Sequence, residues 1–300
     1  MDDNIKIKGK LSIEAKQKIA GALFLAPWVA GFVLFWAYPI FKSAQMSMQD
    51  ITIRGEDLET SFAGLSNFQT LLTTDIYFID AFLAFVMQTA MMVPVIVLFA
   101  LIIAILLNQK FPGKTLFRVL FFLPVVLTTG DLLILLMDQG QGAMDFLANP
   151  SLEEAILLRF GANMGQAIYR VLTSFIIILW YSGVQILILL AGMQSISVNI
   201  YESALIDGAN RWEMLWKITL PSISPFIFIC IVFSVIDQAT MPLNPLLDIM
   251  PVALAGSRVG PGMGSGMGYA AAMGWMQFIY TLFFIGIAFV FFRKSLTQKG

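Results

Sequence analysis

The chain of 300 residues consists of long apolar runs separated by shorter polar segments. A helix rises about 1.5 Å per residue, so roughly 20 apolar residues cross the hydrocarbon of a bilayer. Six runs reach this length, at approximately residues 19–43, 80–107, 115–137, 168–193, 221–241 and 269–292. Prolines inside them are compatible with membrane helices, because neighbouring groups bond the carbonyls that a proline leaves free. The pattern predicts an all-α integral membrane protein with six transmembrane helices.

Lysines and arginines divide unequally between the two sets of loops that these helices create. The set that includes both termini carries thirteen of the 18 basic residues, and the opposite set carries five. Basic residues concentrate on the cytoplasmic side of cell membranes. We therefore expect a multi-pass protein of the cell membrane, with cytoplasmic tails at residues 1–18 and 293–300 around one six-helix domain at 19–292. The outer segments would be about 44–79, 138–167 and 242–268.

Composition supports the membrane assignment and narrows the possible chemistry. Apolar residues make up 58% of the chain and charged residues 12%, whereas about a quarter of a soluble domain is charged. The net charge of −1 provides no basic field for nucleic acid. Histidine is absent and Cys230, in an apolar run, is the only cysteine. We therefore identify no catalytic residue, no metal site and no intrachain disulfide.

The outer segment 242–268 contains five glycines between Gly260 and Gly268, beside Pro261. Glycines four apart can let membrane helices approach closely. Because a proline lies among these glycines in a loop, we expect a flexible hinge there rather than a helix-packing motif.

The longest segment between helices on the expected cytoplasmic side, residues 194–221, is amphipathic. Tyr201–Asp207 fits two helical turns. Gly208 can end these turns in a left-handed conformation, which glycine adopts without steric cost. Asn210 can then cap a second helix with its side-chain oxygen. The segment is predicted to fold as helix, glycine turn and helix.

The second helix of this segment carries an apolar face. The spacing of Trp212, Leu215 and Trp216 places these side chains on one side of a helix, and Pro221 would close the segment and begin the next span. From the residues alone, two interpretations remain open. The helix could lie in the lipid headgroup layer, or it could be a docking surface for a partner protein.

The same segment resembles the EAA loop of ATP-binding-cassette (ABC) importer permeases. That loop places Glu-Ala-Ala, Asp-Gly-Ala and Ile-x-Leu-Pro at fixed distances. The distances agree in Tyr201-Glu202-Ser203-Ala204-Leu205-Ile206-Asp207-Gly208-Ala209 and in Ile218-Thr219-Leu220-Pro221. Ser203 replaces the first alanine of the motif, and Ser197-Val198 stand where a proline often follows. Neither change disturbs the pattern of helix, glycine and helix.

Further matches resemble the MalF-like permeases of the maltose-transporter type. They are Phe24-Leu25-Ala26-Pro27, Tyr38-Pro39, Phe62-Ala63-Gly64-Leu65-Ser66-Asn67-Phe68, Leu116-Phe117-Arg118, Phe121-Phe122-Leu123-Pro124 and Gly268-Tyr269-Ala270-Ala271-Ala272. The resemblance implies a type I importer permease fold and a sugar or oligosaccharide as cargo. It also implies a second, similar permease, two ATPase subunits that bind ATP and Mg²⁺, and an extracytoplasmic solute-binding protein. The large periplasmic insertion of the maltose permease is missing.

In this family the loop carries a coupling helix that sits in a cleft of the ATPase subunit. By position, the resemblance assigns coupling to Glu202, Ala204, Leu205, Asp207, Gly208, Ala209, Trp212 and Leu215. No ATP site is expected in this chain itself. Gly113-Lys114-Thr115 resembles the end of a phosphate-binding loop, but it follows a membrane helix, and Asn108 occupies the position of the required glycine.

Polar and aromatic residues lie at membrane depth in the last three expected helices. They are Trp180, Tyr181, Gln185, Asp237, Gln238, Trp275, Gln277 and Tyr280. Aromatic faces beside amides and carboxylates suit sugar rings, and we predict that these residues line the substrate pathway. Hydrogen bonds between helices, or for Trp275 a place at the membrane interface, remain the alternative. For Asp131, in the third expected helix, a bond between helices is expected.

Other classes of function fit the sequence less well. An ion-coupled secondary transporter usually shows inverted repeats and paired charges within the membrane, and we find neither. A membrane-embedded enzyme would need a convergent nucleophile, base or metal cluster. Within the importer class, a glycerol phosphate ester is the alternative cargo. A phosphate calls for cationic residues along the pathway, and the expected helices hold essentially only Arg118 and Arg170, near their ends.

Overall fold

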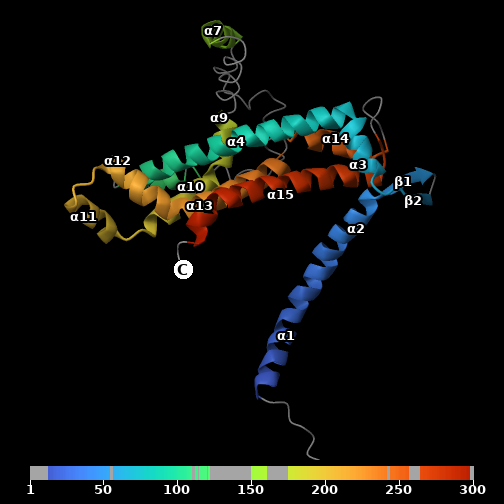
Figure 1. Ribbon diagram of the computed structural model, residues 1–300, viewed down its shortest axis with the longest axis horizontal. Helices are drawn as coiled ribbons and strands as arrows, with labels where there is room; N and C mark the ends of the chain where they lie inside the picture. The colour runs from blue at the N-terminus through green and yellow to red at the C-terminus, as the bar shows by residue number, and fades with distance from the viewer. Residues whose placement is uncertain are drawn as a thin grey trace, which may run out of the picture. The chain divides into compact units, whose positions relative to one another are not determined.

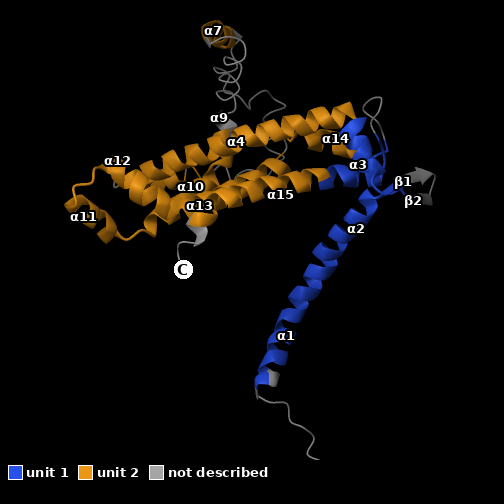
Figure 2. Cartoon of the chain, in the orientation of Figure 1, with its two compact units in different colours: residues 1–74, 252–275 blue, residues 75–251, 276–300 orange. Residues whose placement is uncertain are grey.

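The computed structural model describes residues 13–54, 57–109, 112, 113, 115–119, 121, 150–160, 175–241, 244–256 and 264–297. The chain groups into two compact units, formed by residues 1–74 with 252–275 and by residues 75–251 with 276–300 (Figure 2). Within the described ranges, four helices are long and apolar enough to cross a membrane, and a bent helix pair is a fifth candidate. Most of the third expected helix, with Asp131, lies outside these ranges.

The first unit begins with one continuous helix (Figure 1), formed by α1 (Ile13–Phe32), the π-helical turn η1 (Val33–Ala37) and α2 (Tyr38–Ser47). It contains the first expected span. None of the residues in its most apolar stretch is buried, and the side chains of Phe24 and Phe35 are 90% and 78% exposed. Its apolar surface is therefore available to lipid or to another protein.

A two-stranded antiparallel sheet follows this helix. Strand β1 (Gln49–Arg54) pairs with β2 (Asp57–Phe62) along their whole length. The chain is mostly helical, as predicted, but the strictly all-α expectation is wrong at this point. The β-branched run Ile51-Thr52-Ile53 fits a pleated strand, a signal that its position beside long apolar helices obscured.

The base of the hairpin is fastened to the next helix, α3 (Ser66–Thr73). The side-chain amide of Asn67 donates to the carbonyl oxygens of Ser47 and Gln49, each at 3.0 Å. One side chain thus bonds the end of α2 and the start of β1 together.

Gly266 and Gly268 bring the start of α15 (Met267–Thr297) against β1. A side-chain carbon at Gly268 would overlap the carbonyl oxygen of Gln49, and one at Gly266 would lie 2.5 Å from the carbonyl oxygen of Ile51. Gly266 also has a φ of 104°, which L side chains rarely adopt. These two glycines serve close backbone packing, which differs from the flexible hinge expected for the run.

The second unit contains most of the remaining helices. They are α4 (Ile76–Asn108), α7 (Pro150–Phe160), α9 (Phe175–Tyr181), α10 (Gly183–Gln194), α11 (Val198–Ile206), α12 (Arg211–Met214), the π-helical turn η2 (Leu215–Thr219) and α13 (Leu220–Thr240). Two further helices, α14 (Pro245–Leu254) and α15, each have residues in both units. The second, fifth and sixth expected spans correspond to α4, α13 and α15. The described part of the fourth is divided at Ser182 into α9 and α10.

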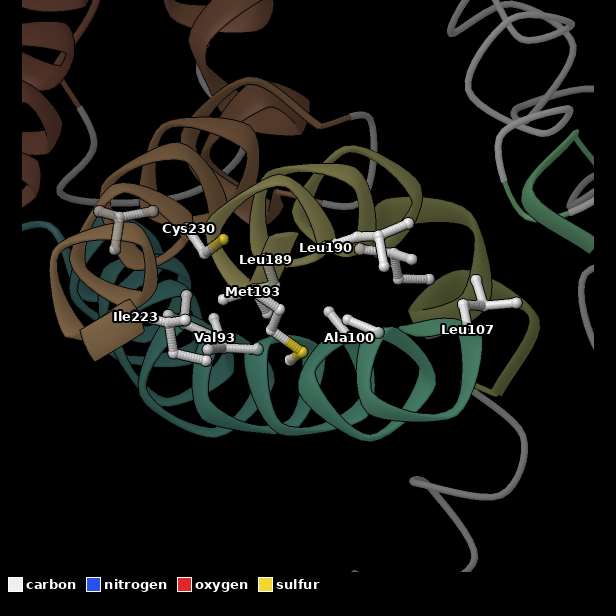
Figure 3. Close-up of a cluster of buried hydrophobic side chains, with 12 residues drawn as sticks. Val93, Ala100, Leu107, Leu189, Leu190, Met193, Ile223 and Cys230 are labelled. Atoms are coloured by element: carbon white, nitrogen blue, oxygen red, sulfur yellow. The ribbon is translucent and has the colours of Figure 1, made fainter. Parts of the chain in front are cut away.

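The core of the second unit lies where α4, α10 and α13 pack together (Figure 3). Its buried side chains are Val93, Val97, Ala100, Ala104, Leu107, Ile186, Leu189, Leu190, Met193, Ile223, Cys230 and Val235. Lipid is as apolar as these side chains, so their association depends on close packing. Gly192 allows such an approach, because a side-chain carbon there would lie 2.7 Å from the ring of Phe226.

Both π-helical turns end two residues before a proline. η1 precedes Pro39 and η2 precedes Pro221. In a regular α-helix the proline ring collides with the carbonyl four residues earlier, and a wider turn relieves this contact. Pro221 lies in the first turn of α13, as expected for the start of the next span. It does not close the amphipathic segment, because one continuous helix runs from Arg211 to Thr240.

We expect Gly268→Ala to lower the melting temperature of the detergent-solubilised protein. The added methyl group has no room beside the backbone of β1, and overpacking typically costs about 1–3 kcal/mol. Gly274→Ala is the control in the same helix, since nothing lies within 4 Å of its side-chain position. Thermal unfolding monitored by intrinsic fluorescence measures both variants. Equal melting temperatures would contradict the close packing at Gly268.

Candidate functional site

The segment between α10 and α13 folds as two helical pieces joined by a tight turn. α11 leaves α10 at an angle of 63°. At its end the N–H of Gly208 donates to the carbonyl of Leu205 at 3.1 Å, and the N–H of Ala209 donates to the carbonyl of Ala204 at 2.9 Å. With the φ of 82° at Gly208, these bonds form a Schellman motif. The predicted left-handed end is confirmed, although α11 begins at Val198, before the expected start.

The second piece begins with a reciprocal cap. The side-chain oxygen of Asn210 accepts the N–H of Glu213 at 2.9 Å, and the carboxylate of Glu213 accepts the N–H of Asn210 at 3.1 Å. This capping box satisfies two N–H groups that a helix start leaves unbonded. Lys217 forms an ion pair with Glu213 at 3.2 Å. The cap at Asn210 is confirmed. The bond from Glu213 back to Asn210 was not predicted, although the Asn-x-x-Glu spacing indicates it.

One side-chain hydrogen bond joins α11 to the start of the fifth span. The hydroxyl of Tyr201 lies 2.9 Å from Oγ1 of Thr219, in η2. The Thr219 hydroxyl donates to the carbonyl of Met214 at 3.2 Å, so its single hydrogen is in use and Tyr201 is the donor. Thr219 is only 8% exposed, so water competes little for this bond. α11 is thereby tied to the helix that continues as α13.

The residues assigned to coupling differ in exposure. Glu202, Leu205, Asp207, Gly208 and Trp212 are exposed, Ala209 and Leu215 are half-buried, and Ala204 is buried. Ala204 packs within the chain, and its carbonyl accepts the bond that ends α11. Ile206, which the sequence did not single out, is 87% exposed beside Leu205. Adjacent exposed apolar side chains on a short helix form a surface that another protein can cover.

Trp212 and Trp216 contact each other edge to face, with ring centroids 5.6 Å apart. This contact confirms that the two indoles share a face of the helix. They are 67% and 55% exposed, and so form an aromatic surface on the outside of the chain.

A concave surface lies beside the glycine turn. This pocket, of about 410 Å³, is lined by Asp207, Gly208, Ala209, Glu213, Met214, Lys217 and Ile218. It combines backbone of the turn with two carboxylates and one ammonium group. The turn therefore presents polar groups and a hollow next to the exposed apolar side chains of α11.

At membrane depth, Gln185 links α10 to α13. Its side chain is fully buried, and its amide nitrogen donates to Oγ of Ser234 at 2.8 Å. The thiol of Cys230, one turn before Ser234, lies 3.6 Å from the backbone carbonyl of Gln185. Gln185 thus makes the interhelical bond considered as the alternative to pathway lining. Its Oε1 atom has no hydrogen-bond partner in the part of the chain that the structure describes.

A second polar contact links α4 to α13. The amide of Gln88 donates to Oε1 of Gln238 at 3.5 Å, and Gln238 is fully buried. Nε2 of Gln238 and Oγ1 of Thr89 are buried and have no hydrogen-bond partner among the described residues. Leaving such an atom unpaired costs about 1–3 kcal/mol, so these atoms favour water or a polar ligand.

Two predicted pathway residues of α15 also bond neighbouring helices. The amide of Gln277 donates to the carbonyl of Ala239 at 2.6 Å. The hydroxyl of Tyr280 donates to the carbonyl of Val86 at 3.3 Å, and its ring packs edge to face against Phe85. These bonds hold α15 to α13 and α4.

The other predicted pathway residues are less buried. Trp180, Tyr181 and Asp237 are half-buried in the second unit. Trp275, also half-buried, belongs to the first unit. Pathway lining stays a prediction for all eight residues.

Sequence reasoning missed several members of the polar network, namely Gln88, Thr89 and Ser234. Each is a polar residue inside an apolar run, which was the available signal. The sequence does not identify their hydrogen-bond partners, because residues that bond each other, such as Gln88 and Gln238, are 150 positions apart in the chain.

A match over most of the chain defines the class of protein. Residues 77–293 match the family of binding-protein-dependent transport system inner membrane components. The chain belongs to this family. It is a multi-pass membrane subunit of a transport system and not an enzyme, which confirms the resemblance to importer permeases.

Two individual relatives are similar to this chain over about three quarters of its length. The arabinooligosaccharides transport system permease protein AraP of Bacillus subtilis (strain 168) is 32% identical over 234 residues, which cover 75% of this chain and 70% of AraP. The sn-glycerol-3-phosphate transport system permease protein UgpA of Yersinia pestis is 28% identical over 232 residues, which cover 73% of this chain and 76% of UgpA.

A solved structure shares the fold. It is the crystal structure of a bacterial ABC transporter involved in the import of the acidic polysaccharide alginate. The similarity covers 95% of this chain and 98% of the matched chain, with a TM-score of 0.61 and 21% sequence identity. The type I importer permease fold implied by the sequence is therefore supported over nearly the whole chain.

Tyr201→Phe should loosen α11 while leaving the fold intact. One sheltered hydrogen bond contributes about 0.5–1.5 kcal/mol, so local opening of α11 should become roughly two- to tenfold more frequent. Hydrogen exchange at the backbone amides of Asp207, Gly208 and Ala209 measures this opening. Tyr38→Phe is the control, because Tyr38 is 61% exposed on α2. Unchanged exchange in Tyr201→Phe would show that the bond does not hold α11.

Proposed function

We propose that this chain forms half of the translocation pathway of an ATP-driven importer for a sugar or oligosaccharide. A partner ATPase subunit would drive it through the capped helix–turn–helix at residues 198–219. The observation that carries the proposal is the bond between Tyr201 and Thr219, because it fastens an exposed helix to a span. A helix held in this way can transmit movement.

The coupling step follows from this rigidity. ATP binding would close two partner ATPase subunits, which hold the ATP and Mg²⁺, and α11 would move with the cleft in which it sits. The continuous helix from Arg211 to Thr240 would carry that displacement into the membrane. The spans would then shift between inward-open and outward-open arrangements, as in other two-state transitions.

The contacts to the ATPase would be mixed in character. Leu205 and Ile206 supply exposed apolar surface, and Glu202 supplies a charge on the same short helix. The pocket beside the turn adds Asp207 and the pair of Glu213 with Lys217. Such a surface suits a cleft with an apolar floor and polar edges.

The cargo is inferred from side-chain chemistry and from the named relatives. Gln185, Gln238 and Gln277 place amides at membrane depth, and Tyr181 and Tyr280 place aromatic rings there. No lysine or arginine occurs in α4, α9, α10, α13 or residues 267–292 of α15. Neutral saccharides need amides and rings, whereas a phosphate ester would call for a cation. A glycerol phosphate ester is the alternative cargo, because the relative UgpA is a permease protein of an sn-glycerol-3-phosphate transport system.

The complete transporter would contain more chains than this one. The exposed apolar helix of α1 and α2 is a surface that a second, similar permease or lipid would cover. A binding protein outside the membrane would deliver the cargo, as the family description implies. The distribution of lysine and arginine supports six spans in all, with both termini and α11 on the cytoplasmic side.

Glu202→Ala should lower both cargo uptake and cargo-stimulated ATP hydrolysis by the assembled transporter. Gly208→Pro should do so more strongly, because proline cannot adopt the φ of 82° found there. A lost charge contact costs roughly 1–3 kcal/mol, equivalent to about a five- to hundredfold loss. Ser197→Ala is the control, since this exposed residue makes no side-chain capping bond. Normal uptake and hydrolysis in both test variants, with normal membrane insertion, would refute the coupling role.

A comparison of Gln185→Met with Ser234→Ala tests whether the side-chain amide of Gln185 lines the substrate pathway. Both variants remove the bond between Gln185 and Ser234, but only Gln185→Met removes the amide. If the amide contacts cargo, Gln185→Met should raise the half-saturating cargo concentration about two- to tenfold above Ser234→Ala. Uptake by vesicles containing the whole transporter measures this difference. Identical uptake curves for the two variants would assign Gln185 to helix packing alone.

A further inference from the structure

A second, larger pocket lies on the other side of the helix–turn–helix. It measures about 540 Å³ and is lined by Ile105, Asn108, Gln109, Met193, Tyr201, Arg211, Trp212, Met214, Leu215 and Thr219. The end of α4, the end of α10, α11 and the start of the helix that continues as α13 all contribute to it. Its walls are mainly apolar, formed by aliphatic and thioether side chains and one indole.

Among the described residues that line this pocket, one side chain is charged, and it is a cation. Arg211 is exposed, and no carboxylate of the described residues forms an ion pair with it. The carboxylates of Glu202, Asp207 and Glu213 are absent from the lining, and Glu213 is already paired with Lys217 beside the smaller pocket. The side-chain amides of Asn108 and Gln109 and the indole N–H of Trp212 add further hydrogen-bond donors to the lining. The pocket therefore combines an apolar interior with a positive, donor-rich rim.

The pocket lies at the level where a span leaves the membrane. Arg211 starts the helix that becomes the fifth span, and α4, the second span, ends at Asn108. Trp212 is 67% exposed beside Trp216, and exposed indoles next to a span occupy the headgroup region of bilayers. An apolar interior with a cationic rim at this depth matches an amphipathic anion.

We propose that this pocket binds an anionic phospholipid of the cytoplasmic leaflet, with its phosphate at Arg211 and an acyl chain between Ile105, Met193 and Leu215. This inference rests on the orientation given under the proposed function but not on the cargo. The two sides of the helix–turn–helix would then contact two different partners. The ATPase covers α11 and the smaller pocket, and lipid fills the larger one. Trp212 and Leu215 then belong to the lipid side rather than to the ATPase contact.

The test uses the assembled transporter in vesicles of phosphatidylethanolamine with and without phosphatidylglycerol. Native mass spectrometry counts the phosphatidylglycerol molecules retained by the purified complex. One cation near an anionic headgroup changes lipid affinity about fivefold, so Arg211→Gln should reduce retention by that factor, and Arg211→Lys should restore most of it. Ile105→Phe, which fills the apolar interior, should also reduce retention.

Lys217→Gln is the matched control, because it removes one positive charge from the same segment on the side of the smaller pocket. It should retain phosphatidylglycerol as the unchanged chain does. The proposal is overturned if Arg211→Gln and Lys217→Gln retain equal amounts, if inorganic phosphate displaces the lipid, or if adding the ATPase subunits to the permease pair expels it. Lipid retention is measured without cargo, so failure of the saccharide assignment would leave this result unaffected.

Discussion

Backbone N–H and C=O groups within hydrocarbon must find their partners inside the protein, because lipid offers none. This constraint explains the length of α4, α13 and α15, which have 33, 21 and 31 residues. It also explains how backbone groups are hydrogen-bonded where a helix is irregular. Where the fourth span is interrupted, the buried hydroxyl of Ser182 donates to the carbonyl of Leu179 at 2.9 Å. Before Pro221 the turn widens, and the N–H of Leu220 bonds the carbonyl of Leu215 instead.

Helix association in the second unit combines small residues with buried amides. Gly192 lets α10 and α13 approach, while Gln185 and Gln238 bond across the helices. Within the described ranges the network is incomplete, because three of its buried atoms lack partners there. A fully satisfied polar network strongly favours one arrangement. An unsaturated one costs less to rearrange, which would suit the alternation between two conformations that we propose for the spans. In the proposed transporter, the residues that bond the helices together would also meet a polar cargo.

The turn between the two helices is fastened on both sides. A Schellman motif closes α11, a capping box opens the next helix, and Tyr201 bonds Thr219 across the two. No break separates this assembly from the fifth span, since the π-helical turn keeps the helix continuous through Pro221. In the coupling step that we propose, a displacement of α11 would therefore reach the membrane with little loss. A flexible linker at Pro221 would have absorbed it.

The sequence alone determined the features that depend on neighbouring residues. Apolar runs located the spans that the structure describes, and the spacing of Gly208, Asn210 and Trp212 predicted the helix–turn–helix, because caps and helix faces involve residues one to four positions apart. Only the tertiary structure decided features that depend on distant partners. The fit of Gly268 against β1 and the pairing of Gln88 with Gln238 join segments far apart in the chain. Polar residues in an apolar run show that partners are needed, but packing in three dimensions selects them.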